Sequence, residues 1–86
     1  DENGKALRNG LEREGIDTLL LEESDRPTGL AAIQVEPSGQ NRIIVISGAN
    51  MTLTAAAVTD ALKHGGYDCV LVGLEVPLEA VHAACR

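Results

Sequence analysis

The sequence predicts an α/β fold with an inserted β-hairpin, and three observations support this prediction. Segments with helical and with strand character alternate along the chain, which fits neither a helical bundle nor a repeat protein. Two strand-like runs, Thr28–Glu36 and Asn41–Ser47, are separated by a short turn that contains Pro37 and Gly39. The apolar run Tyr67–Leu74 is typical of a strand that is buried on both faces of a parallel sheet.

The composition indicates a folded protein and excludes several classes. Hydrophobic residues make up 44% of the chain and charged residues 23%, so collagen-like and disordered chains are excluded. The 86 residues are fewer than the roughly 100 to 150 of a usual domain. The chain lacks an initiator methionine and stops at Arg86 within a predicted helix. We therefore expect a piece of a longer protein.

Charge and aromatic content argue against nucleic-acid and membrane partners. The net charge is −6 and the single aromatic residue is Tyr67, so a phosphate backbone is repelled and no stacking platform exists. No apolar run approaches the roughly 20 residues of a membrane span. The two cysteines, Cys69 and Cys85, suggest neither a disulfide framework nor a zinc site. Cys69 is expected as a small buried hydrophobe, and the setting as reducing and cytoplasmic.

The first element is a predicted helix from about Gly4 to Glu14. Asp1–Asn3 supply capping residues, and Gly15 ends the helix. Gly10 in its middle costs about 1 kcal/mol relative to alanine, so the helix depends on its neighbours. The next segment, Ile16–Leu21, is a short strand candidate, and the polar residues up to Pro27 form a loop.

The predicted hairpin is apolar on both faces. Side chains alternate along a strand, so residues two apart share a face. One face of the first strand carries Ala31, Ile33 and Val35, and the second strand has isoleucine or valine on both faces. A hairpin with one wet face would alternate between polar and apolar residues. Each face must therefore be covered, either within its own domain or by a ligand on one face and a second subunit on the other.

The C-terminal third predicts two helices around the buried strand. Thr54 caps the first of them, Gly65 and Gly66 end it, and Gly48–Asn50 before it is turn material. His64 suits the negative end of this helix and is not expected to bind metal. Pro77 suits the first position of the second helix. One side of that helix is expected to carry Leu78, Val81 and Cys85, and the other Glu79, His82 and Arg86.

Glu75 is the residue with the clearest chemical signal. It follows the apolar run Tyr67–Leu74 directly, and open α/β sheets bind ligands at the carboxyl ends of their strands. A carboxylate at this position can accept hydrogen bonds from hydroxyl groups, and the structural alternative is a solvated glutamate at a strand end. No dinucleotide-binding, Walker, serine-hydrolase or HExxH motif occurs.

Three segments resemble the ribokinase-like (phosphofructokinase B type) sugar kinases. They are the run PTGLAAIQVEPSGQNRIIVISGAN at 27–50, LT at 53–54, and VGLEVPLEAV at 72–81. The opening DxxG, Asp1 to Gly4, and LEREGID at 11–17 are similar to the segment before the lid in that family. The resemblance covers nearly the whole chain.

The resemblance implies a central sheet with flanking helices and an inserted β-lid. Residues 18–47 would supply the lid strands, and 1–17 and 48–86 parts of the α/β core, so that 1–86 is a fragment of one domain. The implied activity is transfer of the γ-phosphoryl group of ATP to D-ribose, giving ribose 5-phosphate, with Mg²⁺ and K⁺. The lid is implied to close over the sugar and to clasp the lid of a second subunit, giving a homodimer.

The family's sugar contacts map to four positions of this chain. The small lid residue corresponds to Ala31, the next contact on the same face to Ile33, the contact on the returning strand to Val45, and the hydroxyl-binding glutamate to Glu75. The catalytic aspartate, the anion hole and the metal and nucleotide sites lie outside the chain, so we expect the chain alone to be inactive. Glu75 and the TGLAAI strand favour ribose. The alternatives are a sibling kinase for fructose, another sugar or a nucleoside, and a non-catalytic β-sheet association module.

Overall fold

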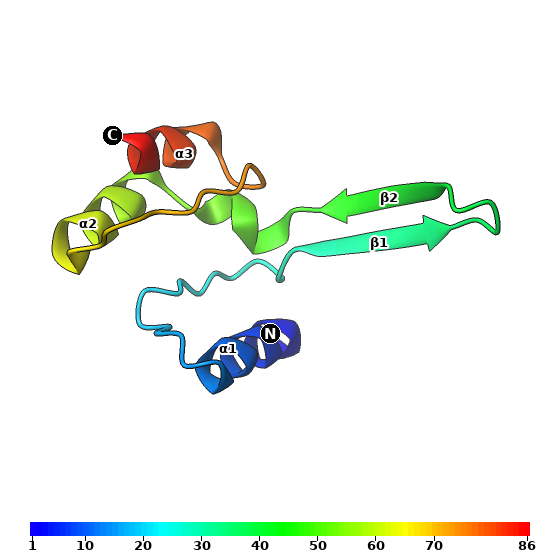
Figure 1. Ribbon diagram of the computed structural model, residues 1–86, viewed down its shortest axis with the longest axis horizontal. Coiled ribbons are helices and arrows are strands. Elements are labelled where there is room, and N and C mark those ends of the chain that lie inside the picture. Colours follow the sequence, from blue (N-terminus) through cyan, green and yellow to red (C-terminus); the bar gives the residue numbers. More distant parts are fainter.

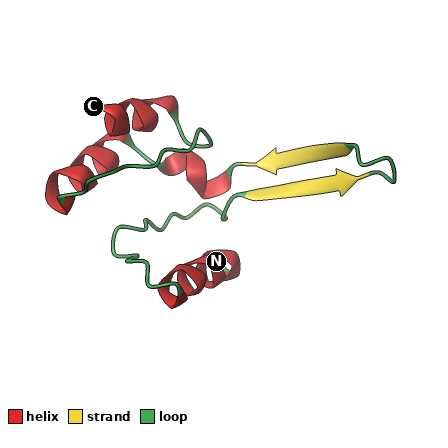
Figure 2. Cartoon of the chain, viewed as in Figure 1, coloured by secondary structure: helices red, strands yellow, loops and turns green.

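The structure, a computed structural model, describes all 86 residues. It mixes helices and strands, as the sequence predicts (Figures 1 and 2). The hairpin extends to one side, while the C-terminal helices lie on the other and the N-terminal helix stands apart from both. In chain order the elements are α1 (Glu2–Arg13), β1 (Leu30–Val35), β2 (Asn41–Ile46), the 3-10 helix η1 (Gly48–Thr52), α2 (Ala55–Gly65) and α3 (Leu78–Cys85).

Helix α1 has the caps that the sequence predicts. The Asp1 Oδ1 atom accepts a hydrogen bond from the Gly4 amide at 2.8 Å, which satisfies one of the free N–H groups of the first turn. The helix ends at Arg13, and Gly15 has a φ of 77°, a left-handed conformation that glycine adopts without strain. Leu7, one of its two leucines, is 59% exposed, and no residue of α1 is buried within this chain.

Strands β1 and β2 form an antiparallel hairpin that confirms both predicted strands. Their ends lie within two residues of the predicted ends. Between them, the amide of Glu36 donates to the carbonyl of Gln40 at 2.8 Å, and Gly39 turns the chain with a φ of 89°. Every residue of both strands is exposed in this chain. The pairing register is Leu30 with Ile46, Ala31 with Val45, Ala32 with Ile44, Ile33 with Ile43, Gln34 with Arg42, and Val35 with Asn41.

The two ends of the hairpin lie against each other at its base. The amide of Ala49 donates to the carbonyl of Pro27 at 2.8 Å, which ties the exit of β2 to the entry of β1. Gly48 has a φ of 54°, and a side chain there would collide with the Pro27 carbonyl oxygen. A Cβ on Gly29 would lie 2.6 Å from the Asn50 amide nitrogen. Glycine is therefore required at both positions for the strands to leave the junction side by side.

Helices α2 and α3 pack against each other through alanines. The Thr54 hydroxyl caps α2 by accepting from the Ala57 amide at 3.1 Å, and Gly66 ends the helix with a φ of 59°. Both signals were predicted. In α3 the buried residues are Ala80, 1% exposed, and Ala83, 6% exposed.

The predicted side of α3 with Leu78, Val81 and Cys85 is not its buried side, since Leu78 is 65% exposed. The buried residues of α3, which packs against α2, are the small Ala80 and Ala83. Pro77 precedes α3 as its N-cap residue, one position before the predicted one.

The expected strands Ile16–Leu21 and Tyr67–Leu74 do not form in this chain. Both segments are irregular, and the second runs past α2 as a long loop (Figure 1). Leu71 is 98% exposed and Cys69 is exposed, contrary to the buried positions expected for them. A strand requires a neighbour for its backbone hydrogen bonds, and the one sheet of this chain contains only β1 and β2. An apolar run predicts burial, but these 86 residues contain nothing that covers it.

Candidate functional site

One face of the hairpin presents three of the four candidate residues. Directly paired residues of an antiparallel hairpin lie side by side on the same face. The register pairs Ala31 with Val45 and Ile33 with Ile43, and Ala31 and Ile33 are two positions apart on β1. Ala31, Ile33 and Val45 therefore lie together on one face, and the pair of Val35 and Asn41 lies on the same face next to the turn. The three candidate residues have no polar side chain, but they can cover an apolar part of a ligand and exclude water.

The opposite face of the hairpin is apolar near its base and polar near its turn. It carries Leu30 and Ala32 from β1 with their partners Ile46 and Ile44 from β2, followed by the pair of Gln34 and Arg42. Ile44 is 68% exposed and Ile46 54% exposed. Both faces of the two-stranded sheet are therefore open within this chain.

Glu75 lies in a separate place, in the turn between the loop 66–73 and α3. It lines an open groove of about 420 Å³, formed by the segment 70–76, α3, α2 and residues just after the hairpin. Ten of its thirteen lining residues are hydrophobic, and the two with polar side chains are Glu75 and Asn50. Asn50 belongs to η1, which directly follows the hairpin, so the groove that contains Glu75 reaches the base of the hairpin. The sequence predicts Asn50 only as turn material, because its place in the groove depends on contacts distant in sequence.

The four candidate residues are not gathered into one pocket by this chain. None of the hairpin residues Ala31, Ile33 and Val45 lines the groove that contains Glu75. The hairpin surface can cover an apolar part of a ligand. In the groove, the carboxylate of Glu75 can accept hydrogen bonds from hydroxyl groups, and the carboxamide of Asn50 can both accept and donate them.

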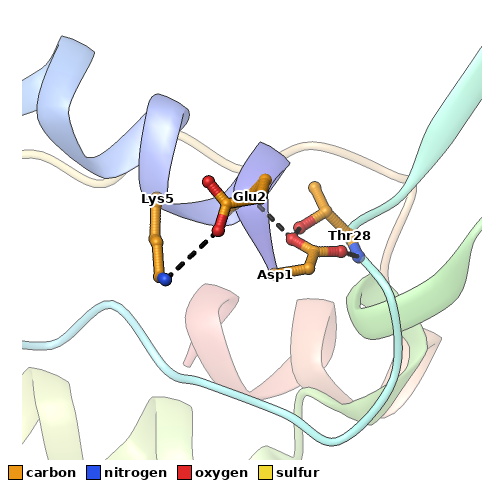
Figure 3. Close-up of polar contacts among 5 residues, drawn as sticks. Asp1, Glu2, Lys5 and Thr28 are labelled. Atoms are coloured by element: carbon orange, nitrogen blue, oxygen red, sulfur yellow. Dashed lines mark hydrogen bonds and ion pairs between the residues drawn. The ribbon is translucent and has the colours of Figure 1, made fainter.

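The base of the hairpin is tied to the start of α1 by a carboxylate. Asp1 Oδ2 accepts from the Thr28 amide at 2.8 Å, and Asp1 Oδ1 accepts from the Thr28 hydroxyl at 2.6 Å (Figure 3). Because Oδ1 also accepts from the Gly4 amide, one side chain caps the helix and holds the residue two positions before β1. The sequence indicates the cap, but not the contact with Thr28, which is 27 residues away.

Metal-binding and membrane-spanning features are absent from the chain. Histidine, cysteine, aspartate and glutamate side chains nowhere gather in threes as a metal site requires. The Nε2 atom of His64, in the last turn of α2, lies 3.4 Å from the Oδ1 atom of Asp60. None of the helices has the length and apolar character needed to cross a membrane.

The fold and the hairpin define a segment of an α/β protein that carries an inserted two-stranded flap, and known proteins share this arrangement. The chain superimposes on the crystal structure of Sa239 with a TM-score of 0.81 and 35% identity, over 98% of this chain and 28% of that one. It is 39% identical to the ribokinase of Haemophilus influenzae, over 100% of this chain and 29% of the relative. It is 40% identical to the bifunctional ribokinase/ribose-5-phosphate isomerase A of Fructilactobacillus sanfranciscensis, over 100% of this chain and 16% of the relative.

Ribokinases of several organisms match all of this chain at 33% to 40% identity, so the chain resembles one segment of the ribokinases. No family model matches the chain. The chain spans less than a third of the length of these relatives, between 16% and 30%.

Proposed function

We propose that this chain is the lid-bearing segment of an ATP-dependent kinase that phosphorylates D-ribose to ribose 5-phosphate. The observation that carries the proposal is the match of the whole chain to proteins named ribokinase, at 33% to 40% identity. The hairpin face with Ala31, Ile33 and Val45 would close over the sugar, and Glu75 would accept hydrogen bonds from its hydroxyl groups. An apolar lid and a carboxylate suit a sugar, because a sugar presents C–H faces together with hydroxyl groups.

The lid would contribute by holding the sugar and excluding water. Phosphoryl transfer depends mainly on positioning and on electrostatic stabilisation, and water in the site would compete with the sugar hydroxyl. Ile33 and Val45 are about 60% exposed in the chain, at 59% and 60%, so both side chains are available for a ligand beneath them. The four residues would bind and orient the sugar, and none of them would take part in bond making.

ATP, Mg²⁺ and K⁺ would bind to parts of the protein outside this chain. The 86 residues contain neither a cluster of metal ligands nor a Walker-type phosphate loop, so they do not fit these groups. Whatever stabilises the transferred phosphoryl group is therefore assigned to the remainder of the protein. A cytoplasmic location belongs to the same proposal and is consistent with the free Cys69 and Cys85.

The second face of the hairpin supports a homodimer. Leu30, Ile44 and Ile46 lie together on the face opposite the proposed sugar contacts and are all more than half exposed. An exposed apolar surface on a hairpin is an aggregation risk unless another surface packs against it. The same face of a second lid would pack against it, so that both apolar surfaces are buried together. We propose that two lids meet through this face in the full-length protein.

The proposal is tested with the full-length protein that contains this chain. ADP release is measured with ribose, fructose and adenosine at fixed ATP, Mg²⁺ and K⁺, and kcat/KM is compared. Ribose should give the highest value. A preference for fructose or adenosine would identify a sibling kinase. Absence of turnover with all three, in a folded dimer, would favour the association module, for which the apolar outer face of the hairpin is the supporting observation.

A further inference from the structure

The Asp1 carboxylate has more partners than a helix cap needs. A capping side chain satisfies one or two N–H groups of its own helix. Asp1 accepts three hydrogen bonds, and two of them come from Thr28, at 2.8 Å from the amide and at 2.6 Å from the hydroxyl. The two bonds from Thr28 span 27 positions of the sequence, and the next longest side-chain hydrogen bond, between Arg8 and Leu21, spans 13.

Thr28 is the point at which such a contact controls the hairpin. It precedes Gly29 and the first residue of β1, and the carbonyl of its neighbour Pro27 holds the exit of β2 through Ala49. Both strands therefore leave from a junction that includes Thr28. Two glycines in this junction, Gly29 and Gly48, allow the close crossing but leave the backbone otherwise free to rotate. The direction of the hairpin is set by whatever holds Thr28.

We propose that Asp1 is a positioning residue: its carboxylate holds Thr28 and so fixes the direction of the hairpin relative to α1. The inference rests on the proposed lid function, because a lid contacts its ligand productively only when it closes in one orientation. Asp1 does not touch the sugar. It acts through Thr28, with the rigid helix α1 as the reference body.

The remaining contacts of α1 cannot take over this task. Arg8 donates to the carbonyl of Leu21 at 3.2 Å, and Glu12 accepts from the hydroxyl of Thr18 at 2.7 Å. Both hold the loop that follows α1, well before the hairpin. The ion pair between Glu2 and Lys5 stays within the helix. Among α1 and its N-cap residue, Asp1 is thus the single side chain that is hydrogen-bonded to the hairpin junction (Figure 3).

The kinetic test uses variants of the full-length enzyme that separate capping from positioning. Asp1→Ser keeps a good capping side chain but is too short to hold Thr28. Thr28→Val removes the hydroxyl bond alone, and Thr28→Ser keeps both bonds. We expect Asp1→Ser to raise the KM for ribose about tenfold, with Thr28→Val intermediate, Thr28→Ser near the parent and the KM for ATP unchanged. Glu2→Gln, which changes the neighbouring carboxylate, is the control and should have no effect.

A distance measurement tests the same inference without enzyme activity. Spin labels are attached at Asn9→Cys in α1 and Ser38→Cys in the hairpin turn, after every native cysteine, Cys69 and Cys85 included, is replaced by serine. Double electron–electron resonance should give a narrow distribution of the distance between the two labels in the parent and in Thr28→Ser, and a broad one in Asp1→Ser. An equally narrow distribution in Asp1→Ser would overturn the positioning role. If no sugar is phosphorylated but the distribution broadens, the proposed function fails and the positioning role stands.

Discussion

At the scale of single residues, the role that we propose for Glu75 concerns a ligand, whereas the role of the glycines of the hairpin junction concerns backbone geometry. Glu75 is one of two polar side chains in a groove that is otherwise mostly apolar. Gly48 is required for a different reason, since both its positive φ and the nearby Pro27 carbonyl exclude a side chain. Substitutions of Glu75 and of Gly48 should therefore give different results.

Glu75→Gln should weaken sugar binding selectively. The substitution removes a charged hydrogen-bond acceptor of about 1.5 to 3 kcal/mol, which corresponds to roughly a ten- to hundredfold higher KM for ribose. Steady-state kinetics of the full-length enzyme should show little change in the KM for ATP. Glu79→Gln, in the first turn of α3, is the matched control. A selective effect of Glu75→Gln on ATP would contradict the assignment.

Gly48→Ala and Gly10→Ala should change stability in opposite directions. Alanine at 48 meets both a positive φ and the Pro27 carbonyl, so the free energy of unfolding should fall by more than about 1 kcal/mol. Gly10 lies inside α1 with open space around its Cβ position, and alanine there should raise the helix stability by up to about 1 kcal/mol. Urea unfolding of the full-length protein measures both. Equal stability of the two variants would argue against a close crossing at the hairpin base.

At the scale of elements, the hairpin differs from an ordinary exposed hairpin because both faces are mostly apolar, with polar residues only at the pairs nearest the turn. Its register places Ala31, Ile33 and Val45 on one face, and Ile44 and Ile46 on the other. The sequence predicts which residues share a face within each strand, since alternation along a strand is a local property. The register comes from the structure, because Val35 pairs with Asn41 and five residues lie between them, whereas the predicted strand ends leave four.

Charged substitutions on the two faces should have separable effects. Ile44→Lys places a charge on the face that we propose to be the subunit contact, and sedimentation velocity should show a shift from dimer toward monomer or aggregate. Ile33→Lys places the same charge on the opposite face and should leave the dimer intact while raising the KM for ribose. Sedimentation that is unchanged for Ile44→Lys and likewise for Ile46→Lys would show that the sheet is covered within its own subunit.

At the scale of the whole molecule, the chain has too little buried surface to be a stable domain. Its accessible area is 7148 Å², whereas a compact protein of 9.0 kDa exposes about 4,900 Å². Its radius of gyration is 15.2 Å, compared with about 12 Å for a compact domain of 86 residues. Only Ala80 and Ala83 are buried. The apolar surface around the groove and the segment Tyr67–Leu74 is expected to be covered by the rest of the protein.

The isolated chain should therefore neither unfold cooperatively nor catalyse. Circular dichroism during heating should show a gradual loss of helix without a sigmoidal transition, because no core exists to melt as a unit. ADP release with ribose should stay at background, since the groups that stabilise phosphoryl transfer are proposed to lie elsewhere. The full-length protein is the positive control. Sustained turnover by the 86-residue chain would show that the catalytic groups lie within it, contrary to the proposal.

The sequence by itself determined the features that depend on near neighbours. The caps at Asp1 and Thr54, the helix ends near Gly15 and Gly66, and both hairpin strands follow from interactions within a few residues. The tertiary structure alone decided the alanine contact between α2 and α3, the place of Asn50 beside Glu75, and the hold of Asp1 on Thr28. The apolar run Tyr67–Leu74 was predicted as a strand, but it does not form a strand in this chain. One physical reason explains all of these differences. A sequence pattern shows which residues of a segment favour burial or pairing, whereas the hydrogen bonds and the packing themselves require a partner segment that only the folded chain brings close.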